Sequence, residues 1–257
     1  FAWDSHLTLS WNKNKIIKLT EGSINPMTGE PITKDNYDMG QLGNLDARVK
    51  LYKGGSIGDV YATHRIKRDG NGNVFVSQEG KIEIESVDEF KLGSILPKTN
   101  MGWSNNFSYK GVNLGMTLTA RFGGIALSGT QSVLDQYGVS QVTANYRDTG
   151  GVPINHGYVD TEKYFDTVKG YAAYYTYSAT NVRLAELSLS YTLPKEWFRD
   201  KLRMTVGLVG KNLWMIYCKA PFDPEATAST QSNYYQSYDY FMQPTTRNLG
   251  FSVKLNF

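Results

Sequence analysis

Side chains able to carry acid–base, nucleophilic or metal chemistry are few in this sequence and lie far apart. The histidines are His6, His64 and His156, and no His-Glu-x-x-His or Gly-x-Ser-x-Gly motif accompanies them. The single cysteine, Cys218, can form neither an internal disulfide nor a zinc cluster. The sequence therefore predicts no catalytic site, no metal centre and no cofactor, and hence a protein that is not an enzyme.

Two short acidic segments have the composition to hold a cation. Residues 69–73 read Asp-Gly-Asn-Gly-Asn, like the start of a calcium loop, but the twelfth position is Gly80, where an EF-hand needs a bidentate Glu. The second segment, Asp223-Pro224-Glu225, brings two carboxylates close together. Both compositions also suit a plain turn, which is our prediction, with cation binding by the second segment as the alternative.

Tyrosines form two clusters in stretches that we expect to be long loops. Aromatic faces stack on sugar rings and pack against peptides, so these side chains are candidates for contact with a ligand or a partner protein. Packing within the loops, or a place in an aromatic girdle at a membrane surface, is the alternative. The candidates are Tyr171, Tyr174, Tyr175, Tyr177, Tyr234, Tyr235 and Tyr238, with Tyr240 beside them.

Strands must position these loops, and the last segment of the chain is the clearest strand. From Leu249 to Phe257 every odd position is apolar or aromatic, while the even positions are Gly, Ser, Lys and Asn. This period-2 pattern predicts a strand with one apolar and one polar face.

The same alternation recurs upstream in segments of about 10–14 residues, longer than the usual ~5–6 of a soluble strand and close to the ~9–11 of a tilted membrane strand. A tight hairpin is expected at Tyr109-Lys110-Gly111. Ser128 and Asp160 are plausible caps for short helices near 128–137 and 160–167. We predict about eight strands, near 2–12, 45–53, 57–67, 100–110, 112–123, 180–193, 201–214 and 244–257.

Composition favours a membrane barrel for these strands. No stretch approaches the ~18 consecutive apolar residues of a membrane helix, but only every second residue of a barrel strand faces lipid. The 18 Tyr, 11 Phe and 5 Trp suit aromatic girdles at the two membrane surfaces. The net charge is only +3 and the basic residues are dispersed, which argues against nucleic acid as a partner.

Unequal connections and the aromatic last residue point to the bacterial outer membrane. Short turns on one side and long loops on the other are typical of barrels there, with the long loops outside the cell. A last strand with a terminal aromatic also resembles the signal that barrel assembly machinery recognises. We predict that role for Leu249, Phe251, Val253, Leu255 and Phe257.

Five stretches, in order along the chain, carry a family resemblance. They are Phe1–Asp4 with Ser10–Ile16; Leu92-Gly93, Pro97 and Ser104–Gly111 with Arg121–Gly124; Asn181–Leu184 with Leu187–Pro194; Gly210–Leu213 with Asp223–Glu225; and Pro244–Arg247. Their order and spacing resemble the C-terminal region of the SusC/RagA family of TonB-dependent outer-membrane transporters.

The resemblance implies a 22-stranded barrel with an N-terminal plug, a TonB-binding segment and a SusD-like lipoprotein lid. It also implies energised import of glycan oligosaccharides or peptides in Bacteroidetes-type bacteria. Residues 1–257 are then expected to be the C-terminal part of the barrel, all-β and antiparallel, without plug domain or TonB box. The chain begins at Phe1 and shows no signal peptide, so we expect a fragment of an exported protein.

Three other interpretations stay open. A self-contained eight-stranded barrel or passive porin would close on itself, a barrel enzyme would bring acidic or Ser/His/Asp groups together in its loops, and a secreted β-sandwich lectin would bury one face of each sheet. For the fragment we predict a curved sheet that stays open. Its outward side chains should include Leu114, Met116, Leu118, Leu187, Leu189, Leu202, Met204 and Val206.

Overall fold

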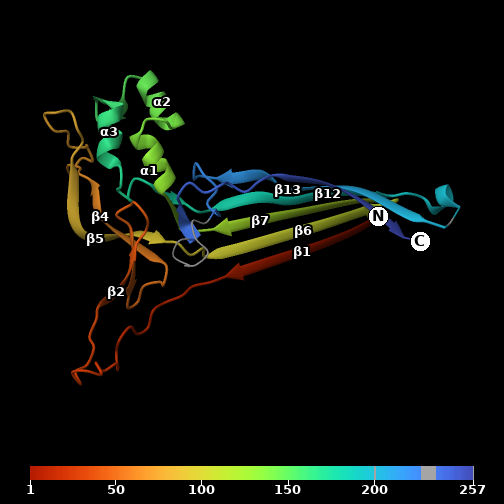
Figure 1. Cartoon of the computed structure of the whole chain (residues 1–257), viewed down its shortest axis with the longest axis horizontal. Coiled ribbons are helices and arrows are strands. Elements are labelled where there is room, and N and C mark those ends of the chain that lie inside the picture. Colours follow the sequence, from red (N-terminus) through yellow and green to blue (C-terminus); the bar gives the residue numbers. More distant parts are fainter. Residues whose placement is uncertain (200, 227–235, 257) are drawn as a thin grey trace.

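The computed structural model describes residues 1–199, 201–226 and 236–256. One long antiparallel sheet runs along most of the length of the molecule, and smaller elements gather at one end of this sheet (Figure 1). Within the described ranges, no helix is long and apolar enough to cross a membrane.

The long sheet has six strands in the order β1-β6-β7-β12-β13-β15. Their bounds are Ala2–Trp11 for β1, Thr99–Tyr109 for β6, Val112–Phe122 for β7, Asn181–Thr192 for β12, Arg203–Cys218 for β13 and Asn248–Asn256 for β15. The first and last of these strands lie at opposite edges and do not pair with each other over the described residues. The sheet is therefore open, as predicted.

The register of the long sheet extends the sequence alternation from strand to strand, because residues opposite each other in antiparallel strands share a face. One face carries the apolar row Trp3, Phe107, Leu114, Leu189, Leu208 and Phe251. The neighbouring row on the other face is Ser108, Asn113, Ser190, Gly207 and Ser252. Of the side chains predicted to share the apolar face, only Leu202 lies outside a strand.

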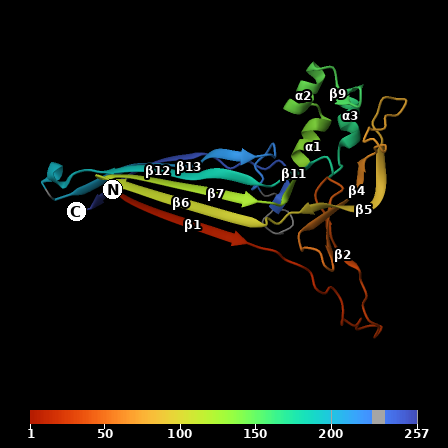
Figure 2. The same ribbon diagram turned by 180° about the vertical axis from the view of Figure 1, so that it is seen from behind.

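Connections at the two ends of the sheet differ in length, as predicted. At one end, β6 and β7 are joined by Lys110 and Gly111, whose φ angles of 45° and 84° suit a type I′ hairpin turn. A short 3-10 helix, η1 (Lys195–Phe198), joins β12 to β13. Both chain ends lie here (Figure 1). The long connections lie at the opposite end, over residues 12–98, 123–180, 219–226 and 236–247 (Figure 2).

We call the described parts of these three connections the loop cap. It contains a four-stranded sheet of β2 (Asn36–Gln41), β3 (Arg48–Tyr52), β4 (Asp59–Ile66) and β5 (Ile84–Ser94). A three-stranded sheet joins β8 (Ile125–Ser128), β11 (Thr176–Ser178) and β14 (Tyr238–Asp239), and β9 (Val152–Ile154) pairs with β10 (Gly157–Val159). The helices are α1 (Gly129–Gln136), α2 (Gln141–Asp148) and α3 (Thr161–Val168).

The prediction of about eight strands in the long sheet is wrong, because two of the predicted strands belong to the loop cap. The strands predicted near 45–53 and 57–67 do form, as β3 and β4, but they belong to the cap sheet and not to the long sheet. Their apolar side chains, among them Val49, Val60 and Ala62, are buried in the cap's own core. Alternation indicates a strand with one covered face, but it does not reveal whether lipid or protein covers that face.

The apolar core of the loop cap draws on all three connections. Its fully buried members include Leu42, Leu45, Val60, Leu127, Phe165, Val168, Tyr175 and Tyr238. Tyr238 comes from the last connection, and its hydroxyl accepts from the Asn44 backbone N–H and donates to Asn44 Oδ1 at 3.0 and 2.5 Å. Its ring fills the space beside Gly43 and Gly129, where no Cβ would fit. The last connection is thus locked onto the first and second.

Two of the cap helices confirm predictions from the sequence. Ser128 accepts a hydrogen bond from Gln131 N at the start of α1, and Asp160 accepts one from Lys163 N at the start of α3. Helix α2, capped by Ser140, was not predicted.

Candidate functional site

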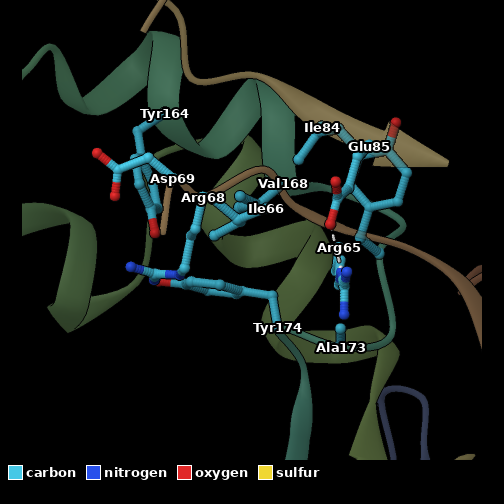
Figure 3. A pocket seen from close by; sticks show the side chains of 11 residues that line it. Arg65, Ile66, Arg68, Asp69, Ile84, Glu85, Tyr164, Val168, Ala173 and Tyr174 are labelled. Atoms are coloured by element: carbon cyan, nitrogen blue, oxygen red, sulfur yellow. Dashed lines mark hydrogen bonds and ion pairs between the residues drawn. The ribbon is translucent and has the colours of Figure 1, made fainter. Parts of the chain in front are cut away.

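A cleft of about 610 Å³ opens in the loop cap between the end of β4, the start of β5 and the segment from α3 to Tyr174 (Figure 3). Its volume lies within the ~300–1,000 Å³ of small-molecule sites. Its floor is apolar, with Ile66, Ile84 and Val168, while tyrosines and charged side chains form its walls. The cleft can therefore hold a ligand of a few rings.

The aromatic wall of the cleft is fixed in place by packing. Tyr164 and Tyr174 meet edge to face with ring centroids 5.8 Å apart, and Tyr171 lies 5.2 Å from the ring of His64. His64 Nδ1 lies 3.0 Å from Asp46 Oδ2, and Asp46 Oδ1 accepts the Ala172 backbone N–H at 2.5 Å. The 171–174 segment is thereby tied to the turn before β3.

Burial raises the pKa of both Tyr164 and Tyr174 above the ordinary phenol value. Both hydroxyls thus stay protonated at neutral pH and keep a hydrogen to donate.

The charged wall of the cleft is formally balanced. Arg65 is paired with Glu85 (Figure 3). Arg68 Nη1 donates to the Gly72 carbonyl at 2.7 Å and forms no ion pair among the described residues. Asp69 accepts three hydrogen bonds from Asn71 and Asn73, at 2.8 to 3.1 Å, and the side-chain bond from Asn73 is the main reason its pKa lies below the ordinary value. The segment 69–73 is a turn, as predicted.

Two of the seven candidate tyrosines, Tyr171 and Tyr174, line the cleft. Tyr177 packs edge to face on Phe222, away from it. Tyr175 and Tyr238 are buried in the cap core, so their proposed contact with a ligand or partner is wrong: an exposed position was inferred for rings that the cap needs for its own packing. Tyr234 and Tyr235 lie outside the described residues.

Sequence reasoning missed the polar lining of the cleft. Arg65 and Arg68 lie at the end of β4, and Tyr164 follows them by about a hundred residues. No local pattern links these positions, because the cleft exists only once α3 packs against the cap sheet. The histidines, in contrast, lie apart as expected: His6 is opposite Ser104 on the polar face and His156 is exposed in the cap.

The second acidic segment forms an ion pair inside the protein. Asp223 Oδ1 lies 2.8 Å from Arg183 Nη2, and both side chains are more than nine-tenths buried. Glu225 lies 3.4 Å from the same nitrogen, and the Thr245 hydroxyl donates to Asp223 at 2.5 Å. Burial alone would raise the pKa of Asp223, but hydrogen bonds from Thr245, the Glu225 amide and Arg183 hold it below the ordinary value. The Glu225 amide also donates to Asp223 Oδ1, which closes the predicted turn.

The predicted assembly strand lies at an edge of the long sheet. Leu249, Phe251, Val253 and Leu255 stand on the apolar face of β15, opposite β13. Phe257 lies outside the described residues.

Comparison with known proteins gives relatives of one kind. No protein-family model matches the chain. TonB-dependent receptor P3 of Formosa agariphila is 26% identical over 272 residues, which cover 100% of this chain and 27% of that receptor. TonB-dependent receptor SusC of Bacteroides thetaiotaomicron is 22% identical over 247 residues, 91% of this chain and 23% of SusC. The chain thus spans about a quarter of the length of these relatives.

Solved structures agree in fold. The RagAB peptide importer in its open-open state aligns with 99% of this chain and 27% of its own at a TM-score of 0.66 and 16% identity. Its closed-closed state aligns with 98% of this chain and 27% of its own at a TM-score of 0.58 and 16% identity. In sequence the chain thus resembles TonB-dependent receptors such as SusC, and in its antiparallel fold it resembles part of the RagAB importer.

Proposed function

We propose that this chain supplies part of the barrel wall and the extracellular loops of an outer-membrane importer that takes up nutrients by TonB-dependent transport. The observation that carries the proposal is the division of the long sheet into one apolar and one polar face. Leu208 and Phe251 on the apolar face are 61% and 69% exposed, an arrangement suited to contact with lipid. The polar face suits a water-filled lumen.

The partners follow from the same proposal. A SusD-like lipoprotein covers the loop side, TonB engages a region outside these residues, and the substrates are glycan oligosaccharides or peptides. The names of the relatives support this assignment, since they include two TonB-dependent receptors and a peptide importer.

Within this importer, the cleft beside Tyr171 and Tyr174 is the proposed site of first contact with the nutrient. Its lining residues belong to the loop cap, and the loop cap lies at the end of the sheet away from the short turns (Figure 1). In an outer membrane this end faces the medium, where a nutrient arrives. Tyr177 and Tyr240, which keep part of their rings exposed, are available to the lipoprotein.

Energised uptake tests the proposal. A strain lacking the complete receptor should grow poorly on its nutrient, and the restored gene should return growth and uptake of a labelled oligosaccharide or peptide. Uptake should stop when TonB is deleted or the proton-motive force is collapsed. Uptake that continues under both conditions would instead indicate a passive porin.

A further inference from the structure

We infer that a second pocket, where the long sheet meets the loop cap, binds a phosphate group. This pocket has a volume of about 360 Å³ and shares no lining residue with the cleft beside Tyr171 and Tyr174. The proposed importer does not require such a ligand for nutrient uptake. Two properties of the lining point to phosphate: fixed positions of the lining segments and an excess of positive charge.

Segments from several parts of the chain line the pocket. They are the residues after β1, the β3–β4 turn, the end of β5, and the links from β5 to β6 and from β7 to β8. Asn12 N donates to the Lys98 carbonyl at 3.0 Å. Asn14 Oδ1 accepts from Ser56 Oγ at 2.8 Å and from Ile57 N at 3.0 Å. Hydrogen bonds between the segments thus set their relative positions.

The charged side chains of the lining are three lysines, Lys13, Lys91 and Lys98, and one aspartate, Asp59. Asp59 is 1% exposed, and its Oδ2 lies 2.6 Å from Lys91 Nζ, so these two charges neutralise each other. Lys13 and Lys98 are exposed and form no ion pair within the described residues. The pocket therefore presents two uncompensated positive charges to a ligand.

A phosphate group matches this lining better than a carboxylate does. A phosphate monoester carries a charge of about −1.5 to −2 near pH 7 and three strong acceptor oxygens, so one ligand can neutralise both lysines. A carboxylate carries a single charge and leaves one lysine unpaired. Ammonium groups bind phosphate as compact point charges. The side-chain amide of Asn12, which has no hydrogen bond within the described residues, adds a neutral donor.

Two sources can supply the phosphate group: a small soluble phosphate ester and the phosphorylated headgroup of a lipid. The pocket begins directly after Trp11, the last residue of β1, whose ring is 69% exposed on the apolar face of the sheet. In the proposed outer membrane an exposed tryptophan at a strand end marks the bilayer surface, where headgroups lie. The lipid source therefore rests on the proposed membrane location, and the soluble source does not.

Isothermal titration calorimetry on the complete receptor, in non-ionic detergent and phosphate-free buffer, tests the inference. The soluble probes are glycerol 3-phosphate, glycerate and glycerol, which share a three-carbon skeleton and differ in charge. Lys13→Gln and Lys98→Gln each remove one uncompensated charge. Lys15→Gln is the matched control, because Lys15 is an exposed lysine of the same segment and lies outside the pocket lining.

We expect glycerol 3-phosphate to bind at least about tenfold more tightly than glycerate, and glycerol not to bind. Each pocket variant should weaken binding of glycerol 3-phosphate about tenfold, whereas Lys15→Gln should change it less than about twofold. Absent binding of glycerol 3-phosphate, equal affinity for glycerate, or an equal loss in all three variants overturns the inference. Heat-modifiable migration of each variant shows that lost binding is not lost folding.

Vesicles distinguish the two sources. The receptor is placed in vesicles of a phosphorylated outer-leaflet glycolipid or of the same glycolipid after dephosphorylation, and binding of labelled glycerol 3-phosphate is measured. Displacement by the phosphorylated glycolipid alone assigns the pocket to a lipid headgroup, and equal binding in both vesicles assigns it to a soluble phosphate. A receptor that shows TonB-dependent uptake but binds no phosphate would overturn this inference and leave the importer intact. Phosphate binding without such uptake would instead remove the importer alone.

Discussion

Arg183 and Asp223 show how one buried pair can tie both ends of a single connection to the long sheet. Arg183 is on the polar face of β12, and Asp223 lies in the connection after β13, beside Thr245 from the segment before β15. Removing one partner leaves a charge buried without compensation, which typically costs ~3–5 kcal/mol.

Asp223→Asn should therefore loosen the segment around residues 219–226. We expect faster amide hydrogen exchange there at pH 7, with Asp148→Asn, a change at an exposed helix position, as the control. Because the folded-state pKa of Asp223 lies below the ordinary ~3.9, the pair contributes fully above that value and loses its contribution as the pH falls through the folded-state pKa. Pepsin should thus cleave the Asp223→Asn variant near Phe222 faster than the unchanged protein at pH 5. In stronger acid the two proteins should be cleaved at equal rates. Equal cleavage at pH 5 would contradict this role.

Leu189 and Ser188 test the two faces of the sheet at adjacent positions. Leu189 lies between Leu114 and Leu208 on the apolar face, and Ser188 lies between Gly115 and Val209 on the other. An arginine at Leu189 should destabilise the complete receptor by ~2–4 kcal/mol if the residue lies near the bilayer midplane. Ser188→Lys should cost little. Unfolding titrations in lipid vesicles measure both, and equal tolerance would refute the assigned faces.

At this scale the sequence predicts faces well and partners poorly. Alternation places Leu189 and Ser188 on the correct sides, because side-chain direction in a regular strand depends on position parity. Arg183 has the parity of Leu189 but lies opposite Thr119 on the polar face, because the register of β12 shifts between Leu184 and Glu186. Long-range packing decides that Arg183 pairs with Asp223, forty residues away, and that Arg68 and Tyr174 line the same cleft. No local sequence pattern indicates either.

Among the elements, too, local features are predicted better than long-range ones. The sequence predicts all six strands of the long sheet from alternation, and helices α1 and α3 from their capping residues. β2 and β5 were missed, because their exposed and charged residues obscure the alternation. In the cap sheet, the ion pair between Arg65 and Glu85 couples β4 to β5, and Lys50 of β3 pairs with Glu89 of β5, which is not its neighbouring strand. These pairings become visible only in the folded register.

The β6–β7 turn depends on backbone conformation. Gly111→Ala should destabilise the hairpin by ~1–2 kcal/mol, because φ is 84° there and a new Cβ would lie 2.8 Å from the Thr192 carbonyl oxygen. Lys110→Asn should be neutral or slightly stabilising, since Asn tolerates the left-handed region. Gly70→Ala, in open space without positive φ, is the control. Urea unfolding of the folded receptor would contradict the proposed strain if Gly111→Ala and Gly70→Ala behave alike.

The final strand is predicted to act during assembly as well as in the finished barrel. Deleting Phe257 from the complete receptor should lower the amount assembled in the outer membrane. Receptor that does assemble should keep its stability to within ~1–3 kcal/mol, the contribution of one side chain. Membrane fractionation measures the first effect and thermal unfolding the second. Normal assembly with only a thermal defect would assign Phe257 to the aromatic girdle alone.

At the scale of the whole molecule, the long sheet has two open edges, β1 and β15. Unpaired strand edges bind other strands readily, so residues 1–257 produced alone should aggregate or form mixed oligomers in detergent. Gel filtration and heat-modifiable migration would detect this, with the complete receptor as the control. A monodisperse, heat-modifiable monomer would show that the sheet can close on itself and would support the small-barrel alternative.

The shared core of the loop cap has a consequence for the order of events during insertion. The core residues Leu42, Phe165 and Tyr238 come from three different connections, and two long strands lie between each connection and the next. No single connection holds the whole core. In the proposed outer membrane each connection must cross the bilayer before it meets the others. The cap therefore cannot fold until the last one has crossed, and Tyr238 completes it. Until that moment the core lacks part of its members, so we expect the newborn receptor to be most open to proteases in this interval.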